Sequence, residues 1–223
     1  MRKRISIAID GPAGAGKTTV AREVARRLGY KYVDTGAMYR AVAWKSLELG
    51  IPLSDEDAIV EMAGAMDIDF AEGDGSRIFV DGVDVSEKIR TPEVTRLSSP
   101  VSAIPGVRRH LVAHQRRLAG DGGVVMEGRD IGSVVLPDAE VKVFLTASVE
   151  ERARRRHEEL LAGGAKVALD TLKQEIEERD RRDSTRSDSP LVKVPDAVTI
   201  DTDGLSVEEV VERILSLCAE RGV

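Results

Sequence analysis

A glycine-rich segment near the N-terminus constrains this chain more than any other feature. Residues 11–18 (GPAGAGKT) match the pattern G-x-x-x-x-G-K-[S/T], directly after an apolar run at 5–9 and before a helical pattern at 19–28. Small residues let backbone N–H groups and the helix N-terminus face an anion. Strand, loop and helix in this order favour a phosphate-binding loop over a plain glycine-rich turn. We therefore expect the chain to bind a nucleoside triphosphate.

Two side chains of this loop carry the expected chemistry. Lys17 would reach the β- and γ-phosphates of ATP, and the Thr18 hydroxyl would ligate Mg²⁺, the expected cofactor. The nucleotide-binding residues predicted here are Gly11, Pro12, Ala13, Gly14, Ala15, Gly16, Lys17, Thr18 and Thr19.

Composition narrows the class of protein. A chain of 223 residues suggests one domain, residues 1–223, or one domain with an insert. The net charge of -6 argues against nucleic acid as a partner. The only cysteine, Cys218, lies in an apolar helical pattern and is predicted to be a buried structural thiol. The apolar run after the basic start stops at Asp10, too short for a signal peptide, and no stretch could span a membrane, so we expect a cytoplasmic protein without a membrane partner.

Short apolar runs alternate with helical patterns, which is typical of a parallel sheet with helices on both faces. The expected core strands are residues 5–9, 32–33, 124–126, 141–145 and 198–200. The last helix is expected from about residue 207 to 221, with Ser206 as its N-cap and Glu209 completing a capping box. We predict an α/β fold with a P-loop parallel sheet core.

One segment interrupts this alternation. Three short runs at residues 67–70, 77–80 and 83–86 alternate in polarity, and Asp81-Gly82 between the last two is a strong hairpin signal. The pattern predicts a small antiparallel β insert at about residues 65–90, which is either decoration or a substrate-binding flap.

A second segment, from Arg152 to Arg186, is dense in charge and is divided by Gly163-Gly164. Its arginines share helix faces at spacings of three and four: Arg152 and Arg156 before the glycines, and Arg179, Arg182 and Arg186 after them. Arginine neutralises migrating phosphoryl groups, so the pattern predicts a mobile helical lid at about residues 152–190. A solvated helix with Glu175–Arg179 and Glu178–Arg182 pairs explains the segment equally well.

Polar side chains follow two of the predicted strands. Residues 127–130 (EGRD) come after the third strand, and residues 34–40 (DTGAMYR) come after the second. In an open α/β sheet the carboxyl ends of parallel strands line the ligand crevice. We therefore expect both segments to contribute to a binding site.

Together these segments resemble the bacterial cytidylate kinase family, ATP-dependent kinases of CMP and dCMP. The matching blocks, in family order, are GPAGAGKTT at 11–19, DTGAMYR at 34–40, IRTPEV at 89–94, EGRDIGSVVLPDA at 127–139 and ERDRRDSTRSDSPL at 178–191. The resemblance implies a P-loop core, a monophosphate-binding insert with a small β-sheet, and an arginine-bearing lid. It also implies ATP and CMP or dCMP as small-molecule partners.

Roles for single residues follow from the same resemblance. It implies that Ser99, Arg108 and Asp130 bind cytosine, Arg179 and Asp183 the ribose, Arg40, Arg129 and Arg186 the CMP phosphate with Thr35 beside it, Arg152 the adenine, and Arg156 the ATP phosphates. The expected catalytic residues are Lys17, Arg129, Arg179 and Arg182. Glu127 is assigned to the CMP site, where it either orders a Mg²⁺-bound water or holds Arg129. Glu127 and Thr35 differ from the family pattern, in which Asp and Ser are common at these positions. Both residues keep the functional group, so the difference lies in how far it extends and not in its chemistry.

The expected base contacts suit cytosine. Its N4 amino group donates to a carboxylate such as Asp130, while N3 and O2 accept from Arg108 or Ser99. Uracil reverses this pattern at O4 and N3, and a buried mismatch of this kind discriminates strongly.

Other functions stay open at this point. The core suits small P-loop kinases of AMP, UMP, shikimate or gluconate, and a regulatory ATP-binding module is the alternative from another class. A GTPase switch is disfavoured because N-K-x-D is missing from a chain without asparagine. The three histidines, His110, His114 and His157, lie in charged helical stretches and are expected at the surface. With no obvious apolar surface helix, we expect a monomer.

Overall fold

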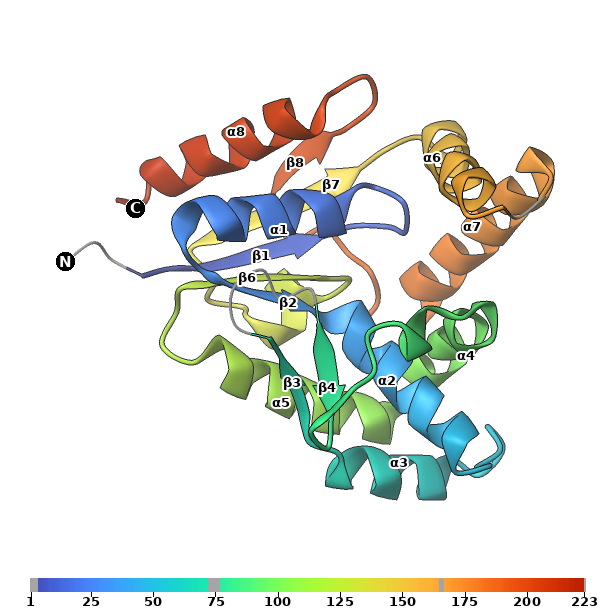
Figure 1. Ribbon diagram of the computed structural model, residues 1–223. Helices are drawn as coiled ribbons and strands as arrows, with labels where there is room; N and C mark the ends of the chain where they lie inside the picture. Colours follow the sequence, from blue (N-terminus) through green and yellow to red (C-terminus); the bar gives the residue numbers. More distant parts are fainter. Residues whose placement is uncertain (1–3, 72–76, 165–166, 223) are drawn as a thin grey trace.

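A five-stranded parallel sheet forms the centre of the computed structural model, which describes residues 4–71, 77–164 and 167–222 (Figure 1). The strand order is β2-β6-β1-β7-β8. The strands are β1 (Ser6–Asp10), β2 (Lys31–Asp34), β6 (Val124–Gly128), β7 (Val141–Thr146) and β8 (Val198–Asp201). Each overlaps one of the five predicted runs, so the predicted core is confirmed. Every pair in this sheet is parallel.

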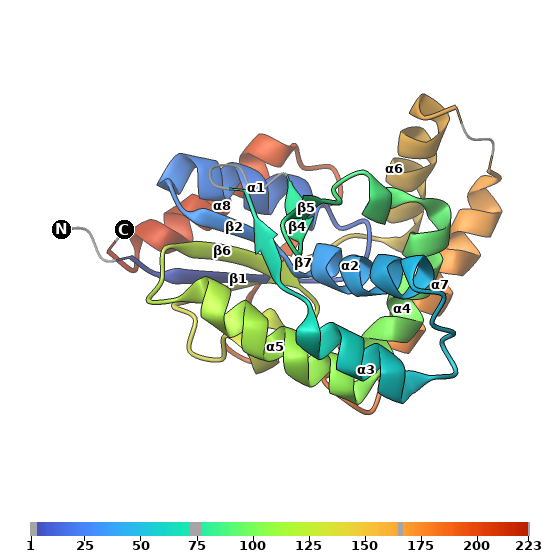
Figure 2. The ribbon, with the colours of Figure 1, turned by 60° about the horizontal axis from the view of Figure 1, so that its bottom comes forward.

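Helices cover both faces of the sheet, as the sequence pattern predicts (Figures 1 and 2). Ile7 and Ile9 of β1 pack on one face against α1 (Lys17–Leu28) and α8 (Val207–Ala219), whereas Ala8 faces the opposite side. The other helical elements are α2 (Thr35–Glu48), α3 (Glu56–Ala65), η1 (Lys88–Arg90), α4 (Pro92–Ala103), α5 (Pro105–Ala119), the π-helical turn η2 (Ile131–Val135), α6 (Val149–Ala162) and α7 (Leu169–Thr185). Helices α2 to α5 bury their apolar residues on the Ala8 side.

Local rules explain how two of the helices begin. Gly11 has a φ of 150°, and a Cβ there would lie 2.0 Å from the Leu145 carbonyl oxygen, so only glycine lets the chain turn out of β1 beside β7. Helix α1 then begins at Lys17, two residues before the predicted start. Ser206 and Glu209 form the predicted capping box at the start of α8.

The insert is the antiparallel sheet that the sequence predicts. Its strands are β3 (Ile68–Phe70), β4 (Ile78–Val80) and β5 (Val83–Asp84), in that order. Asp81 and Gly82 have φ values of 51° and 77°, which fits the hairpin turn expected of an Asp-Gly pair. Residues 72–76 of the insert and 165–166 of the predicted lid segment lie outside the described residues.

Helices α6 and α7 flank the Gly163-Gly164 break and stand at the carboxyl ends of the strands (Figure 2). They pack on each other through a small cluster of Ala153, Leu172 and Ile176, separate from the two clusters on the faces of the sheet. Cys218 is buried, as predicted. Among the described helices, none combines the length and the apolar character that a membrane crossing requires.

Candidate active site

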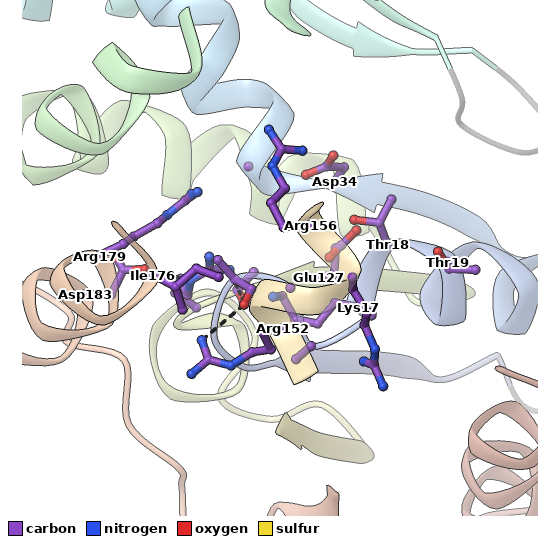
Figure 3. Close-up of a pocket in the computed structure, with 18 of the residues that line it drawn as sticks. Lys17, Thr18, Thr19, Asp34, Glu127, Arg152, Arg156, Ile176, Arg179 and Asp183 are labelled. Atoms are coloured by element: carbon purple, nitrogen blue, oxygen red, sulfur yellow. Dashed lines mark hydrogen bonds and ion pairs between the residues drawn. The ribbon is translucent and has the colours of Figure 1, made fainter. Parts of the chain in front are cut away.

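A cleft of about 1020 Å³ opens at the carboxyl ends of β1, β2 and β6. The P-loop, the start of α2, helix α4 and the lid helices line it (Figure 3). Most of the predicted site residues reach this cleft: Ala13, Gly14, Ala15, Gly16, Lys17, Thr18, Thr19, Thr35, Arg40, Ser99, Arg108, Glu127, Arg129, Asp130, Arg152, Arg156, Arg179, Asp183 and Arg186. Gly11 and Pro12 lie outside its lining, and Arg182 is exposed and also lies outside it.

Lys17 is buried at the floor of the cleft, at the first residue of α1. Its Nζ donates a hydrogen bond to the Pro12 carbonyl oxygen at 2.7 Å, so the ammonium is held within its own loop. Burial, followed by repulsion from Arg129, lowers its pKa to about 7. Bound phosphate would favour the charged form of Lys17, since an anion offsets both of these effects.

Glu127, at the end of β6, lies beside the P-loop. Tyr32 donates its phenolic hydrogen to Glu127 Oε1 at 2.5 Å, and the Thr18 side chain also hydrogen-bonds to this carboxyl group. Burial and the neighbouring Asp34 raise the pKa of Glu127. Thr35, the first residue of α2, donates a hydrogen bond to the Glu127 carbonyl oxygen at 2.7 Å. The backbone of Glu127 thus holds the start of α2, while its side chain contacts Tyr32 and Thr18.

Asp34 joins β2 to α2 and binds one of the predicted phosphate ligands. Its Oδ1 accepts the Ala37 N–H as an N-cap at 2.9 Å, and Oδ2 accepts from Arg40 Nη2 at 2.9 Å. Burial works to raise the pKa of Asp34, but Arg40 and the Ala37 N–H outweigh it and hold the pKa below its usual value. Asp34 therefore fixes the guanidinium of Arg40 over the cleft.

Arg108 and Asp130 form a buried ion pair on the α4–α5 side of the cleft. The Arg108 guanidinium lies 5.7 Å above the centre of the Tyr39 ring, and Arg186 Nη2 lies 3.7 Å from Asp130 Oδ1. Within the described residues, Arg108 Nε and Arg186 Nη2 are buried without a hydrogen-bond partner. Ser99 lines the cleft nearby on α4. This corner thus offers both a carboxylate acceptor and unused guanidinium donors to a polar ligand.

A group of arginines lies between this corner and the P-loop. Arg129 Nε donates to Asp183 Oδ2 at 2.9 Å, and Arg179 projects from α7 beside it (Figure 3). Burial, followed by repulsion from Arg129, lowers the pKa of Arg179 to about 10, and in the described part of the chain Arg179 has no ion pair. Arg40, Arg129 and Arg179 therefore concentrate positive charge in a cleft, an arrangement that suits phosphate groups.

The arginines of α6 are divided between structure and cleft. Arg152 is buried and pairs with Asp180 of α7, whereas Arg156 is exposed and pairs with Glu159. Neither Glu–Arg pair expected on α7 is among the ion pairs of the described residues. Pairs of this type form on α6 instead, between Glu151 and Arg154, Glu151 and Arg155, and Glu158 and Arg154. The solvated-helix interpretation thus describes the outer face of α6, while α7 presents Arg179 to the cleft.

Within the described residues, neither the histidines nor a cluster of metal-binding side chains contributes to this site. His110 is exposed, His114 and His157 are half-buried, and none of the three lines the cleft. In residues 4–71, 77–164 and 167–222, no group of three or more His, Cys, Asp or Glu side chains is placed to hold a metal ion.

Sequence reasoning missed several residues that shape the site, and Asp10 is the clearest of them. It is buried at the end of β1, and its two carboxylate oxygens each accept an N–H at 2.8 Å, from Ile131 and from Gly132. Asp10 thereby fixes the turn that follows Arg129 and Asp130. Its position at a strand end was a usable signal, as it was for Asp34. Arg155 is a second residue of this kind, and no sequence signal indicated it. Its Nη2 donates to the Thr202 carbonyl oxygen at 2.9 Å, and both residues line the cleft.

Asp10 makes stability depend on pH. Burial raises the pKa of its carboxyl group from 3.8 to about 6. Folding therefore favours the protonated form, and this stabilising contribution is present below the unfolded pKa and is lost as pH rises through 6. Relative to Asp10→Asn, the wild-type free energy of unfolding should fall by about 2 kcal/mol between about pH 4.5 and pH 7. Urea titrations across this range measure the difference, and a constant difference would contradict the assignment.

The fold and the cleft define a class: a P-loop kinase in which charged side chains line the same cleft as the P-loop. The cytidylate kinase family model matches residues 7–220. The chain is 56% identical to the cytidylate kinase of Geobacillus kaustophilus (strain HTA426) over 99% of both chains. It is 54% identical to that of Desulfitobacterium hafniense (strain Y51), covering 97% of this chain and 94% of that relative. The chain belongs to the cytidylate kinase family.

A solved structure supports the fold alone. The gluconokinase from Sinorhizobium meliloti 1021 is similar with a TM-score of 0.51 at 19% identity, over 100% of this chain and 95% of that one. At this identity the similarity extends to the fold and not to the substrate.

Proposed function

We propose that the protein transfers the γ-phosphoryl group of ATP to CMP and dCMP, giving ADP with CDP or dCDP. One observation carries the acceptor assignment: the buried Arg108–Asp130 pair lies in the same cleft as the P-loop. A phosphate-binding loop and a polar pocket for a base within one cleft suit direct, in-line transfer between two bound nucleotides. Family membership supports the same choice of acceptor.

Base recognition would rest on Asp130. Its carboxylate accepts a hydrogen bond from the cytosine N4 amino group, while Arg108 or Ser99 donates to N3 or O2. Because Arg108 and Arg186 both lie against Asp130, the carboxylate is held in one orientation before the base arrives. Uracil would place O4, an acceptor, against this carboxylate, which is costly in a buried site.

The phosphates would be held by the arginines between the two ends. Arg40 and Arg129 would bind the CMP phosphate, with Thr35 beside it, and Asp183 would bind the ribose. A CMP phosphate oxygen is already anionic near neutral pH, so the attack needs no general base. Lys17 and Arg179 would stabilise the charge that develops on the transferred group.

Mg²⁺ fits the donor set beside the P-loop. The Thr18 hydroxyl lies against the Glu127 carboxyl group, which gives one neutral ligand and one acidic partner for bound water. Mg²⁺ at phosphate sites keeps several waters and takes few protein ligands, so a cage of carboxylates is not required. When bound, the ion would neutralise charge on the β- and γ-phosphates.

Two segments would move or close around the substrates. We assign the insert at about residues 65–90 to the monophosphate-binding region and residues 152–190 to the lid. The lid helices pack on a core of their own, which permits them to shift without disturbing the sheet. Closure would exclude water, which otherwise competes with CMP for the phosphoryl group.

The test is ADP formation from ATP and Mg²⁺ with CMP, dCMP, UMP and AMP supplied separately. We expect strong activity with CMP and dCMP, weak activity with UMP and none with AMP. A preference for AMP would retain the P-loop kinase and remove the base assignment. ATP binding without product from any acceptor would support the regulatory module instead.

A further inference from the structure

Arg152 makes contacts that neither ATP nor CMP recognition accounts for. The family resemblance points it at adenine, yet its guanidinium is engaged by three acceptors of the protein itself. Nε donates to the Ala147 carbonyl oxygen at 3.0 Å, and Nη1 donates to the Ala13 carbonyl oxygen at 3.2 Å. Figure 3 shows where Arg152 lies in the cleft. Nη1 also lies 2.7 Å from Asp180 Oδ2. These acceptors belong to the end of β7, the P-loop and helix α7.

The contact with the P-loop is close. A Cβ on Gly14 would lie 3.0 Å from Arg152 Cβ, so the loop backbone packs directly on the stem of this side chain. A P-loop directs its N–H groups at the phosphates, while Ala13 directs its carbonyl oxygen at Arg152. A shift of the loop on binding triphosphate would therefore move an acceptor of Arg152.

The contact with α7 lies next to the acceptor site. Asp180 stands between Arg179 and Asp183 in sequence, and both of these line the cleft. Asp180 Oδ1 is buried and has no hydrogen-bond partner among the described residues. The other oxygen, Oδ2, forms the ion pair with Arg152. Because α6 and α7 have only a small apolar core, polar links of this kind fix where α7 sits relative to the P-loop.

We propose that Arg152 and Asp180 are positioning residues that couple occupancy of the P-loop to the placement of Arg179 and Asp183. Triphosphate on the loop sets the position of the Ala13 carbonyl group, and Arg152 transmits that position to α7 through Asp180. Donor binding then tightens acceptor binding, and the reverse holds by linkage. This inference rests on the proposed function, because it takes CMP as the acceptor.

Asp180→Asn tests the link, since it removes the charge and keeps the shape. CMP is titrated calorimetrically into the protein alone and into protein saturated with Mg²⁺ and a non-hydrolysable imido analogue of ATP. In the wild type, the analogue should lower the Kd for CMP by at least about fivefold. In Asp180→Asn this ratio should fall to about one, while the Kd for CMP alone changes by less than about threefold. Glu177→Gln is the matched control: it removes one exposed acid from the same helix and should keep the wild-type ratio.

Several results would overturn the proposal. A wild-type ratio of one, or an unchanged ratio in folded Asp180→Asn, removes the coupling role even if the wild type phosphorylates CMP normally. If Asp180→Asn does not fold, Arg152→Lys takes its place, because one ammonium cannot reach acceptors on three elements. A wild type that binds neither CMP nor dCMP would instead fail the proposed function, and this inference with it.

Discussion

Lys17→Met should lower kcat by about 10³-fold or more while the protein stays folded. Lys17 is the cation at the floor of the phosphate loop, and methionine keeps much of its stem while removing the charge. Its Nζ is hydrogen-bonded to the Pro12 carbonyl oxygen. The nearby buried acids Asp10 and Glu127 keep their own hydrogen bonds, from backbone N–H groups and from Tyr32, when the lysine is replaced. Steady-state kinetics with saturating ATP and CMP measure the effect.

A matched control separates the effect of losing any lysine charge from the effect of losing the charge in the P-loop. Lys31→Met removes one positive charge at the first residue of β2, where Lys31 forms a 3.7 Å ion pair with Asp69 and lies outside the cleft lining. It should leave kcat within about twofold of the wild type. A folded Lys17→Met protein, with an unchanged Tm and near-normal kcat, would exclude this loop as the site of phosphoryl transfer.

Asp130→Asn should lower kcat/KM for CMP by about 100-fold or more and should lower it far less for UMP. The amide can turn an N–H toward the uracil O4, whereas cytosine loses its anionic acceptor. Arg108 would also lose its counter-ion in a buried position, which loosens the orientation of the pair. The ratio of kcat/KM between the two bases is the quantity to measure.

Asp188→Asn is the control for this change. Asp188 Oδ1 lies 3.8 Å from Arg108 Nε, but its side chain is 40% exposed and lies outside the cleft lining. The loss of its charge should change kcat/KM for CMP by less than about threefold. Equal losses for CMP and UMP in Asp130→Asn would show that the residue supports the cleft without choosing the base.

Local signals were enough to predict the frame of this protein. The apolar runs of the central strands have no other stable place than a sheet covered on both faces, and the structure places them there. Asp81-Gly82 specified the hairpin, since both residues need a positive φ. Strand ends predicted the location of the cleft because parallel strands bring their carboxyl ends to one edge.

Other parts of the site were beyond the sequence pattern. Asp10 binds a turn about 120 residues away, and Arg152 joins three separate elements, so no local spacing predicts either contact. Arg182 was expected to share a stripe with Arg179. At about 100° per residue, however, position i+4 stays closer to the same face than i+3, which places Asp183 in the cleft and leaves Arg182 exposed. The base contacts came from the family resemblance alone.

The central claim is direct transfer from ATP to a cytidine monophosphate. The most direct measurement runs the four-acceptor assay with ATP labelled in its γ-phosphate and separates the nucleotides by chromatography. We expect the label to appear in CDP and dCDP, in step with ADP formation and with little release as inorganic phosphate. Label found mainly in inorganic phosphate, or in the AMP-derived product, would contradict it.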